Sequence, residues 1–327
     1  MKILIIKPSS FGDIIQASPV VRALKEDLPE VQVTWLVFKN WEETVDLFPG
    51  LSGKIIWDRG LGFRGYLRAI REVRREKFDV VIDLQGLART AVIARLSGAR
   101  KIIGVPGLKE LSWLLLKESF PESRGLNAVN RNLETVRYLT GKAHEPAFEL
   151  RLSDGAEKAA SLMLELNGVQ SGDKVIAFIP KARGNSKTWP RQYYDELAGL
   201  ILSKARFRII ALGAKGDGKG LLNPEITDLC GRTSIKTLAA VLARCSAVVG
   251  GDTGPVHLSS ALGVPTVAVF GGSDVNETSP VSANAKVLAR DLSCSPCRGR
   301  PTCDNYACLA SIKPAEVYDA LKAMLNL

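Results

Sequence analysis

Short runs of Ile, Val and Leu alternate with segments of helical spacing along most of the chain, and this alternation restricts the fold more than any other feature. The runs are almost continuously apolar, as in parallel strands buried on both faces. They predict strands at residues 2–7, 31–37, 54–57, 79–84, 174–179, 207–212, 247–250, 266–270 and 286–288. Helices are predicted at residues 19–28, 65–77, 191–204, 235–244, 255–262 and 314–327. The pattern indicates an α/β protein with doubly wound parallel sheets.

The chain length favours two domains over one. It has 327 residues, and the segment 144–153 contains Pro146 and little periodicity, so we predict domains at 1–152 and 153–327. No apolar run approaches the ~20 residues that span a bilayer. The run Ile3–Ile6 is too short for a signal peptide and ends at Lys7, so we expect a cytoplasmic protein.

The charge balance points to an anionic partner. The net charge is +10, and residues 59–101 hold 11 basic and 4 acidic side chains. Such a field favours nucleic acid, a membrane surface or an acidic glycolipid. Aromatic residues are not interleaved with this stretch, so a platform for single-stranded nucleic acid is not indicated. Arg64 and Arg68 recur at helical spacing, either as a solvated face or as a surface for phosphorylated or carboxylated acceptors.

The segment Gly250–His257 has the form of a strand, a tight loop and a helix start. A helix start carries unpaired N–H groups and partial positive charge, which suits a phosphate. Thr253 is placed to cap this helix, and Pro255 fits its first turn. Here the pattern predicts a diphosphate and ribose clamp from Asp252, Thr253, Gly254 and His257. The alternative is an ordinary capped helix with a core histidine.

A second loop, Ser9–Asp13, follows the first predicted strand. Asp13 lies near a helix start at the carboxyl end of that strand, where a general base could take a proton from an acceptor hydroxyl. The helix N-terminus would keep the carboxylate ionised and therefore only weakly basic. The alternative is a capping aspartate, which is common. Ser9, Ser10 and Gly12 are the neighbouring candidates for acceptor contacts.

The loop Pro180–Pro190 holds three cations and small residues after the first predicted strand of the second half. Lys187 is predicted to neutralise charge on a departing nucleotide diphosphate. We find no Asp-x-Asp pair of the kind that holds a metal–diphosphate complex, so a divalent ion is not expected to be required. Residues 213–218 do not form G-x-G-x-x-G, which weakens a dinucleotide interpretation.

Four cysteines lie close together near the end of the chain. Cys294, Cys297, Cys303 and Cys308 form C-x2-C-x5-C-x4-C. The first pair is typical of a zinc or iron–sulfur knuckle, whereas the remaining spacing is not standard. The alternatives are a structural Zn²⁺ site, reduced thiols or opportunistic disulfides.

Several motifs together resemble glycosyltransferase family 9, the ADP-heptose–lipopolysaccharide heptosyltransferases, with a C-terminal region similar to heptosyltransferase II. In chain order these are K-x-S-S-x-G-D at 7–13, S-K-x-W-P at 186–190, G-D-T-G-P-x-H-L at 251–258, A-L-G-x-P-T-V-x-x-F-G at 261–271 and C-S-P-C at 294–297. Family members often read P-G-A-S where this chain has Pro180-Lys181-Ala182-Arg183.

The resemblance implies a GT-B fold, with two Rossmann-like domains facing a cleft and the last helix, about 314–327, packing back on the first domain. It implies inverting, metal-independent transfer of heptose from ADP-heptose to the lipid A–Kdo inner core, at the inner leaflet of the inner membrane. Asp13 is then the base, Lys187 contacts donor phosphate, and Asp217 lies near the ribose or adenine.

Two other functions remain open from the residues. One is a nucleotide-sugar enzyme of the same fold, such as an epimerase, which would convert the donor without an acceptor. The other is a basic nucleic-acid-binding protein with a cysteine knuckle, although no RNA-binding signature is present.

Overall fold

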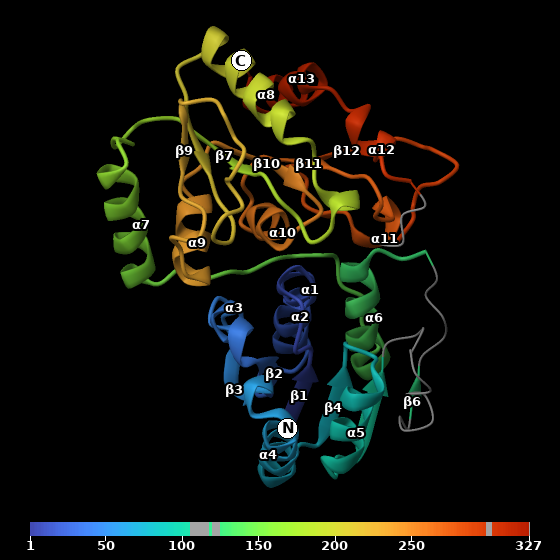
Figure 1. Cartoon of the computed structure of the whole chain (residues 1–327). Helices are drawn as coiled ribbons and strands as arrows, with labels where there is room; N and C mark the ends of the chain where they lie inside the picture. Colours follow the sequence, from blue (N-terminus) through green and yellow to red (C-terminus); the bar gives the residue numbers. More distant parts are fainter. Residues whose placement is uncertain (105–117, 120–124, 299–302, 327) are drawn as a thin grey trace. The chain divides into compact units, whose positions relative to one another are not determined.

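The computed structural model describes residues 1–104, 118–119, 125–298 and 303–326. The chain divides by internal contacts into two compact units, Met1–Arg151 and Leu152–Leu327. Each unit is built on one parallel six-stranded sheet with helices on both faces (Figure 1). The predicted α/β class with two doubly wound sheets is therefore confirmed.

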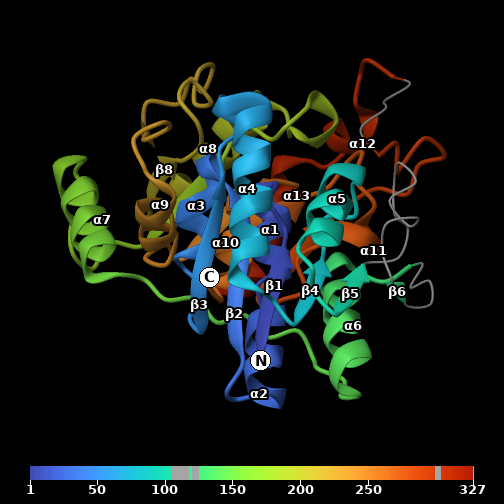
Figure 2. The same cartoon turned by 90° about the horizontal axis from the view of Figure 1, so that it is seen from below.

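The first unit has the strand order β3-β2-β1-β4-β5-β6, so the direction of winding reverses between β1 and β4. One face of the sheet packs against α4 and α5, and α2 and α6 lie side by side away from that pair (Figure 2). The elements are β1 Lys2–Ile6, α1 Phe11–Ala17, α2 Pro19–Asp27, β2 Gln32–Phe38, η1 Lys39–Trp41, α3 Glu42–Val45, β3 Leu51–Trp57, η2 Arg59–Leu61, α4 Gly62–Glu76, β4 Val80–Asp83, α5 Ala88–Leu96, β5 Lys101–Gly104, β6 Glu118–Ser119 and α6 Ala128–Thr140.

The second unit repeats this topology with the order β12-β11-β10-β7-β8-β9, which reverses between β7 and β10. Its elements are α7 Asp154–Leu166, β7 Val175–Ile179, η4 Asn185–Lys187, α8 Arg191–Lys204, β8 Arg208–Ala211, β9 Ile226–Asp228, α9 Ile235–Leu242, β10 Ala247–Gly251, α10 Gly254–Ala261, β11 Thr266–Val269, α11 Val275–Thr278, β12 Ala285–Leu288, α12 Ala307–Ala310 and α13 Pro314–Leu325.

The central strands are buried on both faces, which explains their continuous apolar sequence. Every residue of β7 and β10 is buried. A core cluster joins these strands to Trp189, to Tyr194 of α8 and to Val317 of α13. The last helix therefore packs on α8 within its own unit. Its predicted packing on the first unit stays a prediction, and Leu327 lies outside the described residues.

Candidate active site

The strongest cluster of charged groups lies at the winding reversal of the second sheet. Ligands of doubly wound sheets bind outside the carboxyl ends of the strands at this point. Lys187 follows β7 in η4, and Asp252 follows β10 directly. Because β7 and β10 are parallel neighbours, the two residues meet although they are far apart in sequence.

Asp252 is the centre of this cluster. Its Oδ2 accepts hydrogen bonds from Lys187 Nζ at 2.5 Å and from Ser273 Oγ at 2.5 Å. Its Oδ1 lies 3.0 Å from His257 Nε2. The Asp252 side chain is 7% exposed and that of Lys187 is 30% exposed, so the lysine keeps a solvent-facing surface. We call these four residues the Asp252 network.

The electrostatics of the Asp252 network fix a permanent negative charge. Burial alone would raise the pKa of Asp252, but the hydrogen bond and charge of His257 and the charge of Lys187 outweigh it. The pKa of Asp252 is therefore held well below its ordinary value. An ionised Asp252 orders the Lys187 ammonium and favours the tautomer of His257 that donates from Nε2.

Two glycines allow close packing at the end of β10, one against the loop that carries Lys187 and the other against the start of α10. A Cβ at Gly251 would lie 2.0 Å from the carbonyl oxygen of Lys187. A Cβ at Gly250 would lie 2.7 Å from the side chain of Val256. Gly251 therefore permits the close approach of the loop that positions Lys187.

The start of α10 agrees only in part with the sequence prediction. Thr253 occupies the N-cap position and Pro255 lies in the first turn. However, the Thr253 side chain makes no capping hydrogen bond, so the predicted side-chain cap is wrong. His257 is buried and paired with Asp252. Its contact with the donor, like that of Thr253 and Gly254, stays a prediction.

Asp217 lies in the loop after β8 and has other partners than the Asp252 network. Its Oδ2 accepts the backbone N–H of Ala214 at 2.8 Å, and its Oδ1 lies 3.5 Å from Lys181 Nζ. Lys181 is one of the two cations that depart from the family pattern. The Lys181–Asp217 pair therefore joins the loops that follow two adjacent strands, β7 and β8.

In the first unit, Asp13 is the N3 residue of α1 and its side chain is exposed. Its Oδ2 accepts hydrogen bonds from the backbone N–H of Ser10 at 3.0 Å and from Ser10 Oγ at 2.5 Å. The alternative interpretation, a capping aspartate, is thus present. This capping contact does not exclude a role as a base, because the Asp13 side chain remains exposed at the carboxyl edge of β1. Ser9 and Ser10 are half-buried and Gly12 lies within α1.

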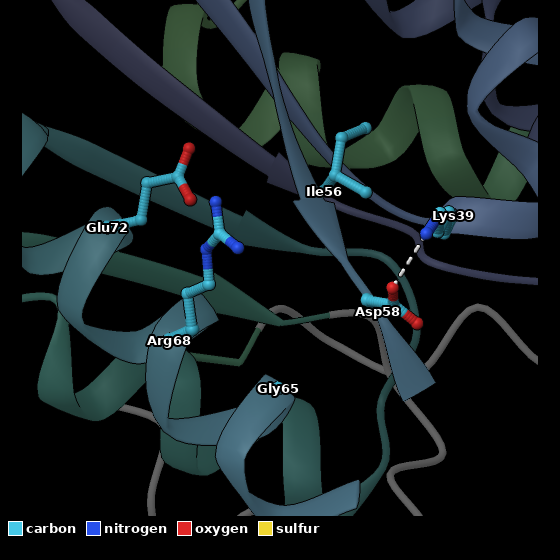
Figure 3. A pocket seen from close by; sticks show the side chains of 6 residues that line it. All are labelled: Lys39, Ile56, Asp58, Gly65, Arg68 and Glu72. Atoms are coloured by element: carbon cyan, nitrogen blue, oxygen red, sulfur yellow. Dashed lines mark hydrogen bonds and ion pairs between the residues drawn. The ribbon is translucent and has the colours of Figure 1, made fainter. Parts of the chain in front are cut away.

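A hollow of about 230 Å³ lies between α4 and the carboxyl ends of β2 and β3. It is lined by Lys39, Ile56, Asp58, Gly65, Arg68 and Glu72 (Figure 3).

Arg68 and Glu72 enter this hollow from α4, and Lys39 faces Asp58 from η1 at 2.9 Å (Figure 3). The hydrogen bond from Lys39 lowers the pKa of Asp58. Arg64 is exposed on α4 but does not line the hollow.

Sequence reasoning missed several residues that these sites use. Ser273 comes shortly after β11, in the sequence Gly271-Gly272-Ser273 that follows the predicted strand 266–270. Lys39 and Asp58 directly follow β2 and β3. Polar residues immediately after predicted parallel strands were the available signal, because the carboxyl ends of such strands share one edge of the sheet.

The four C-terminal cysteines form no disulfide. Cys297 Sγ lies 3.7 Å from the carbonyl oxygen of Gly272, and Cys308 is buried. Within the described residues, no group of three or more His, Cys, Asp or Glu side chains is placed to hold a metal ion. Structural Zn²⁺ at Cys294, Cys297, Cys303 and Cys308 stays a prediction, which elemental analysis of the purified protein would test. In the described part of the chain, no helix is long and apolar enough to cross a membrane.

Comparison with known proteins agrees with this architecture. A Campylobacter jejuni lipooligosaccharide heptosyltransferase 2 is 28% identical over 100% of this chain and 99% of that protein. The structure of E. coli ADP-heptose lipopolysaccharide heptosyltransferase II matches with a TM-score of 0.82 and 23% identity, over 100% and 99% of the two chains. The structure of E. coli heptosyltransferase WaaC with ADP matches with a TM-score of 0.77 and 21% identity, over 99% and 100%. Residues 66–307 match glycosyltransferase family 9 (heptosyltransferase), and the chain is therefore a glycosyltransferase of that family.

Proposed function

We propose that this glycosyltransferase moves heptose from ADP-heptose to the anionic lipid A–Kdo inner core of lipopolysaccharide, with inversion and without a metal ion. The observation that carries the proposal is the Lys187–Asp252 pair at the winding reversal of the second sheet. It is the place where a doubly wound sheet binds nucleotides. The heptosyltransferase names of relatives along the full chain, and a relative solved with ADP, support the donor and the sugar.

In the proposed reaction, Lys187 takes the role that a divalent ion has in other nucleotide-sugar enzymes. When the bond between the anomeric carbon and the diphosphate breaks, negative charge grows on the leaving ADP. Lys187 is already oriented by Asp252, so it stabilises this charge without reorganising. The first-turn N–H groups of α10, beginning at Gly254, add partial positive charge beside it.

Asp13 is the proposed base. The acceptor hydroxyl attacks the anomeric carbon from the face opposite to ADP and loses its proton to Asp13. A carboxylate at a helix N-terminus is weakly basic, so the proton leaves late, when the new carbon–oxygen bond is largely formed. Arg64 and Arg68 of α4 supply positive charge for the acidic acceptor, whereas Lys39 in the hollow is paired with Asp58. The excess of basic residues at 59–101 supports our proposal that the protein acts in the cytoplasm at the anionic surface of the inner leaflet.

One incubation tests the reaction. Purified protein is given ADP-heptose with or without detergent-solubilised Kdo2–lipid A, in EDTA. We expect the glycolipid to gain one heptose, and NMR to show an anomeric configuration opposite to that of the donor. Conversion of the donor without acceptor would indicate an epimerase instead. Loss of transfer in EDTA that is restored by Mg²⁺ would refute metal independence.

The base is tested by Asp13→Asn, because an amide oxygen can still accept the Ser10 N–H while it cannot take a proton at neutral pH. We expect kcat to fall by about 10²–10⁴ while ADP binding, read by thermal shift, is unchanged. Asp154→Asn is the matched control, since Asp154 lies in the first turn of α7. If Asp13→Asn keeps turnover within a few-fold of wild type, Asp13 is a capping residue alone.

A further inference from the structure

The winding reversal of the first sheet carries a buried aspartate that the proposed mechanism does not use. Asp83 is the last residue of β4 and pairs with Ile6 of β1. Lys7 follows Ile6 and precedes the loop that leads to Asp13. Asp83 and Lys7 therefore lie at the carboxyl edge of the sheet, at the point where winding reverses.

Asp83 is fully buried and only partly satisfied. Its Oδ1 accepts the N–H groups of Gln85 at 2.9 Å and Gly86 at 3.2 Å. Among the described residues, Asp83 Oδ2 and Gln85 Oε1 are buried and have no hydrogen-bond partner. Burial raises the pKa of Asp83 to about 6, although the nearby Thr90 hydroxyl, the N–H groups of Gln85 and Gly86 and, least of all, the Lys7 charge oppose that change. A carboxyl group in this environment is costly to the fold, and such groups concentrate at functional sites.

Lys7 is held by the turn that Asp83 closes. Its Nζ donates to the carbonyl oxygen of Leu84 at 2.9 Å, and its own carbonyl oxygen accepts Trp35 Nε1 at 3.1 Å. Leu84 lies between Asp83 and the two N–H groups that Asp83 binds. The position of the Leu84 carbonyl, and hence of the Lys7 ammonium, therefore depends on the Asp83 carboxyl group.

The second sheet also has a lysine and an aspartate at its winding reversal, although Lys187 lies eight residues beyond its strand and bonds Asp252 directly. Lys187 follows the strand on one side of the reversal, and Asp252 follows the strand on the other side. Lys7 and Asp83 follow or end the corresponding strands β1 and β4. In the second unit this arrangement orients a lysine toward the edge at which ligands bind.

We infer that Asp83 is a positioning residue of the first unit, which holds the turn 84–87 and the Lys7 ammonium so that Lys7 contacts an anionic group of the acceptor. Asp83 itself touches no substrate, since it is fully buried. The inference rests on the proposed function, because it assigns the acceptor to the first unit. It predicts that Asp83 affects acceptor binding and leaves donor binding unchanged.

The test compares Asp83→Asn, Lys7→Met and the double variant with wild type. Asparagine can still accept the Gln85 and Gly86 N–H groups, but it removes the charge beside Lys7, and hydrogen bonds to an amide oxygen are weaker than those to a carboxylate. The turn 84–87 and the Lys7 ammonium are therefore held less firmly. We expect each single change to raise KM for Kdo2–lipid A at least five-fold, with KM for ADP-heptose and kcat within two-fold. The KM of the double variant for Kdo2–lipid A should be no higher than that of the more impaired single variant, because both changes disrupt the same contact with the acceptor.

Asp27→Asn is the matched control. Asp27 is another buried carboxylate of the first unit, paired with His144 and Thr140 at the end of α2. We expect this change to reduce stability and to leave KM for both substrates unchanged. A merely structural role for Asp83 predicts that neither variant changes KM for either substrate.

Two results would overturn the inference. One is an acceptor KM for Asp83→Asn within two-fold of wild type. The other is a double variant whose acceptor KM rises by the product of the two single effects. Binding of Kdo2–lipid A is also measured calorimetrically, without donor. If wild type binds the glycolipid but forms no heptosylated product, the proposed function fails while the Kd of the variants still tests Asp83. If wild type binds no glycolipid, both proposals fail.

Discussion

Replacing Asp83 with asparagine should stabilise the first unit, and the gain should grow with pH. In the folded protein, burial raises the pKa of the Asp83 carboxyl group to about 6, against 3.8 for an exposed aspartate. Between these values the folded state binds a proton that the unfolded state has released. Stability therefore falls as pH rises through this window, and the full penalty is present above pH 6.

The magnitude follows from the two pKa values. Each pKa unit corresponds to about 1.4 kcal/mol. The penalty from Asp83 is then about 2 kcal/mol at pH 5 and about 3 kcal/mol at pH 8. Asparagine carries no charge at either pH. The free energy of unfolding of the variant, relative to wild type, should therefore increase by about 1 kcal/mol between pH 5 and pH 8.

The assay is hydrogen exchange of peptides from β1 and β4 in increasing urea, which reads the opening of the first unit. The comparison between the two pH values removes any pH-independent cost in stability of placing an amide group at position 83. Asp27→Asn should change stability with pH in the opposite direction. Burial opposes ionisation of Asp27, but hydrogen bonds from Thr140 and His144 lower its pKa. Its variant should lose most stability at pH 8 and less as pH falls toward 4. A pH-independent difference for Asp83→Asn, or a loss that deepens at pH 8, would refute the reasoning.

Two further predictions concern the Asp252 network. Gly251→Ala places a Cβ 2.0 Å from the Lys187 carbonyl oxygen, so it should cost about 1–3 kcal/mol of stability. It should also abolish the stabilisation by ADP in a thermal-shift assay. An unchanged response to ADP would show that the close approach of this loop is not needed for ADP binding. Ser273→Ala removes one of the hydrogen bonds to Asp252 Oδ2 and should cost about 1–3 kcal/mol, with a raised KM for ADP-heptose measured by initial rates; an unchanged KM would separate Ser273 from donor binding.

Much of the fold could be predicted because the central strands are apolar without interruption. The runs at 174–179 and 247–250 correspond to β7 and β10 within one residue at each end. Among the elements that were not predicted are the helices α5, α6 and α7 and the strands β5 and β9. In α5, apolar and polar residues are mixed around the helix, since Ala88–Leu96 lacks a clear polar face. Its helical form depends on packing against α4 and β4, which periodicity does not reveal.

The candidate site was predictable where its residues lie in contiguous motifs and not where it depends on strand order. Lys187, Asp252 and His257 were recognised from loops at strand ends, and the structure brings them together. Their partner Ser273 comes from a third loop, and its contact required the order β11-β10-β7. Asp83 was passed over inside a predicted strand, although a charged residue ending the run Val80–Ile82 is itself a signal of special chemistry.

The two winding reversals use the same residue types in different electrostatic states. Asp252 has a lysine, a histidine and a serine around it and remains ionised, which suits a lysine that must stabilise charge appearing on a leaving diphosphate. Asp83 has an unsatisfied oxygen and a raised pKa, so its charge is held at a cost to stability. A permanent charge is required where negative charge develops during reaction, whereas a lysine that contacts an acceptor already carrying its charge needs only a fixed position. The difference in hydrogen bonding between the Asp252 and Asp83 carboxyl groups therefore agrees with the different tasks that we propose for the two units.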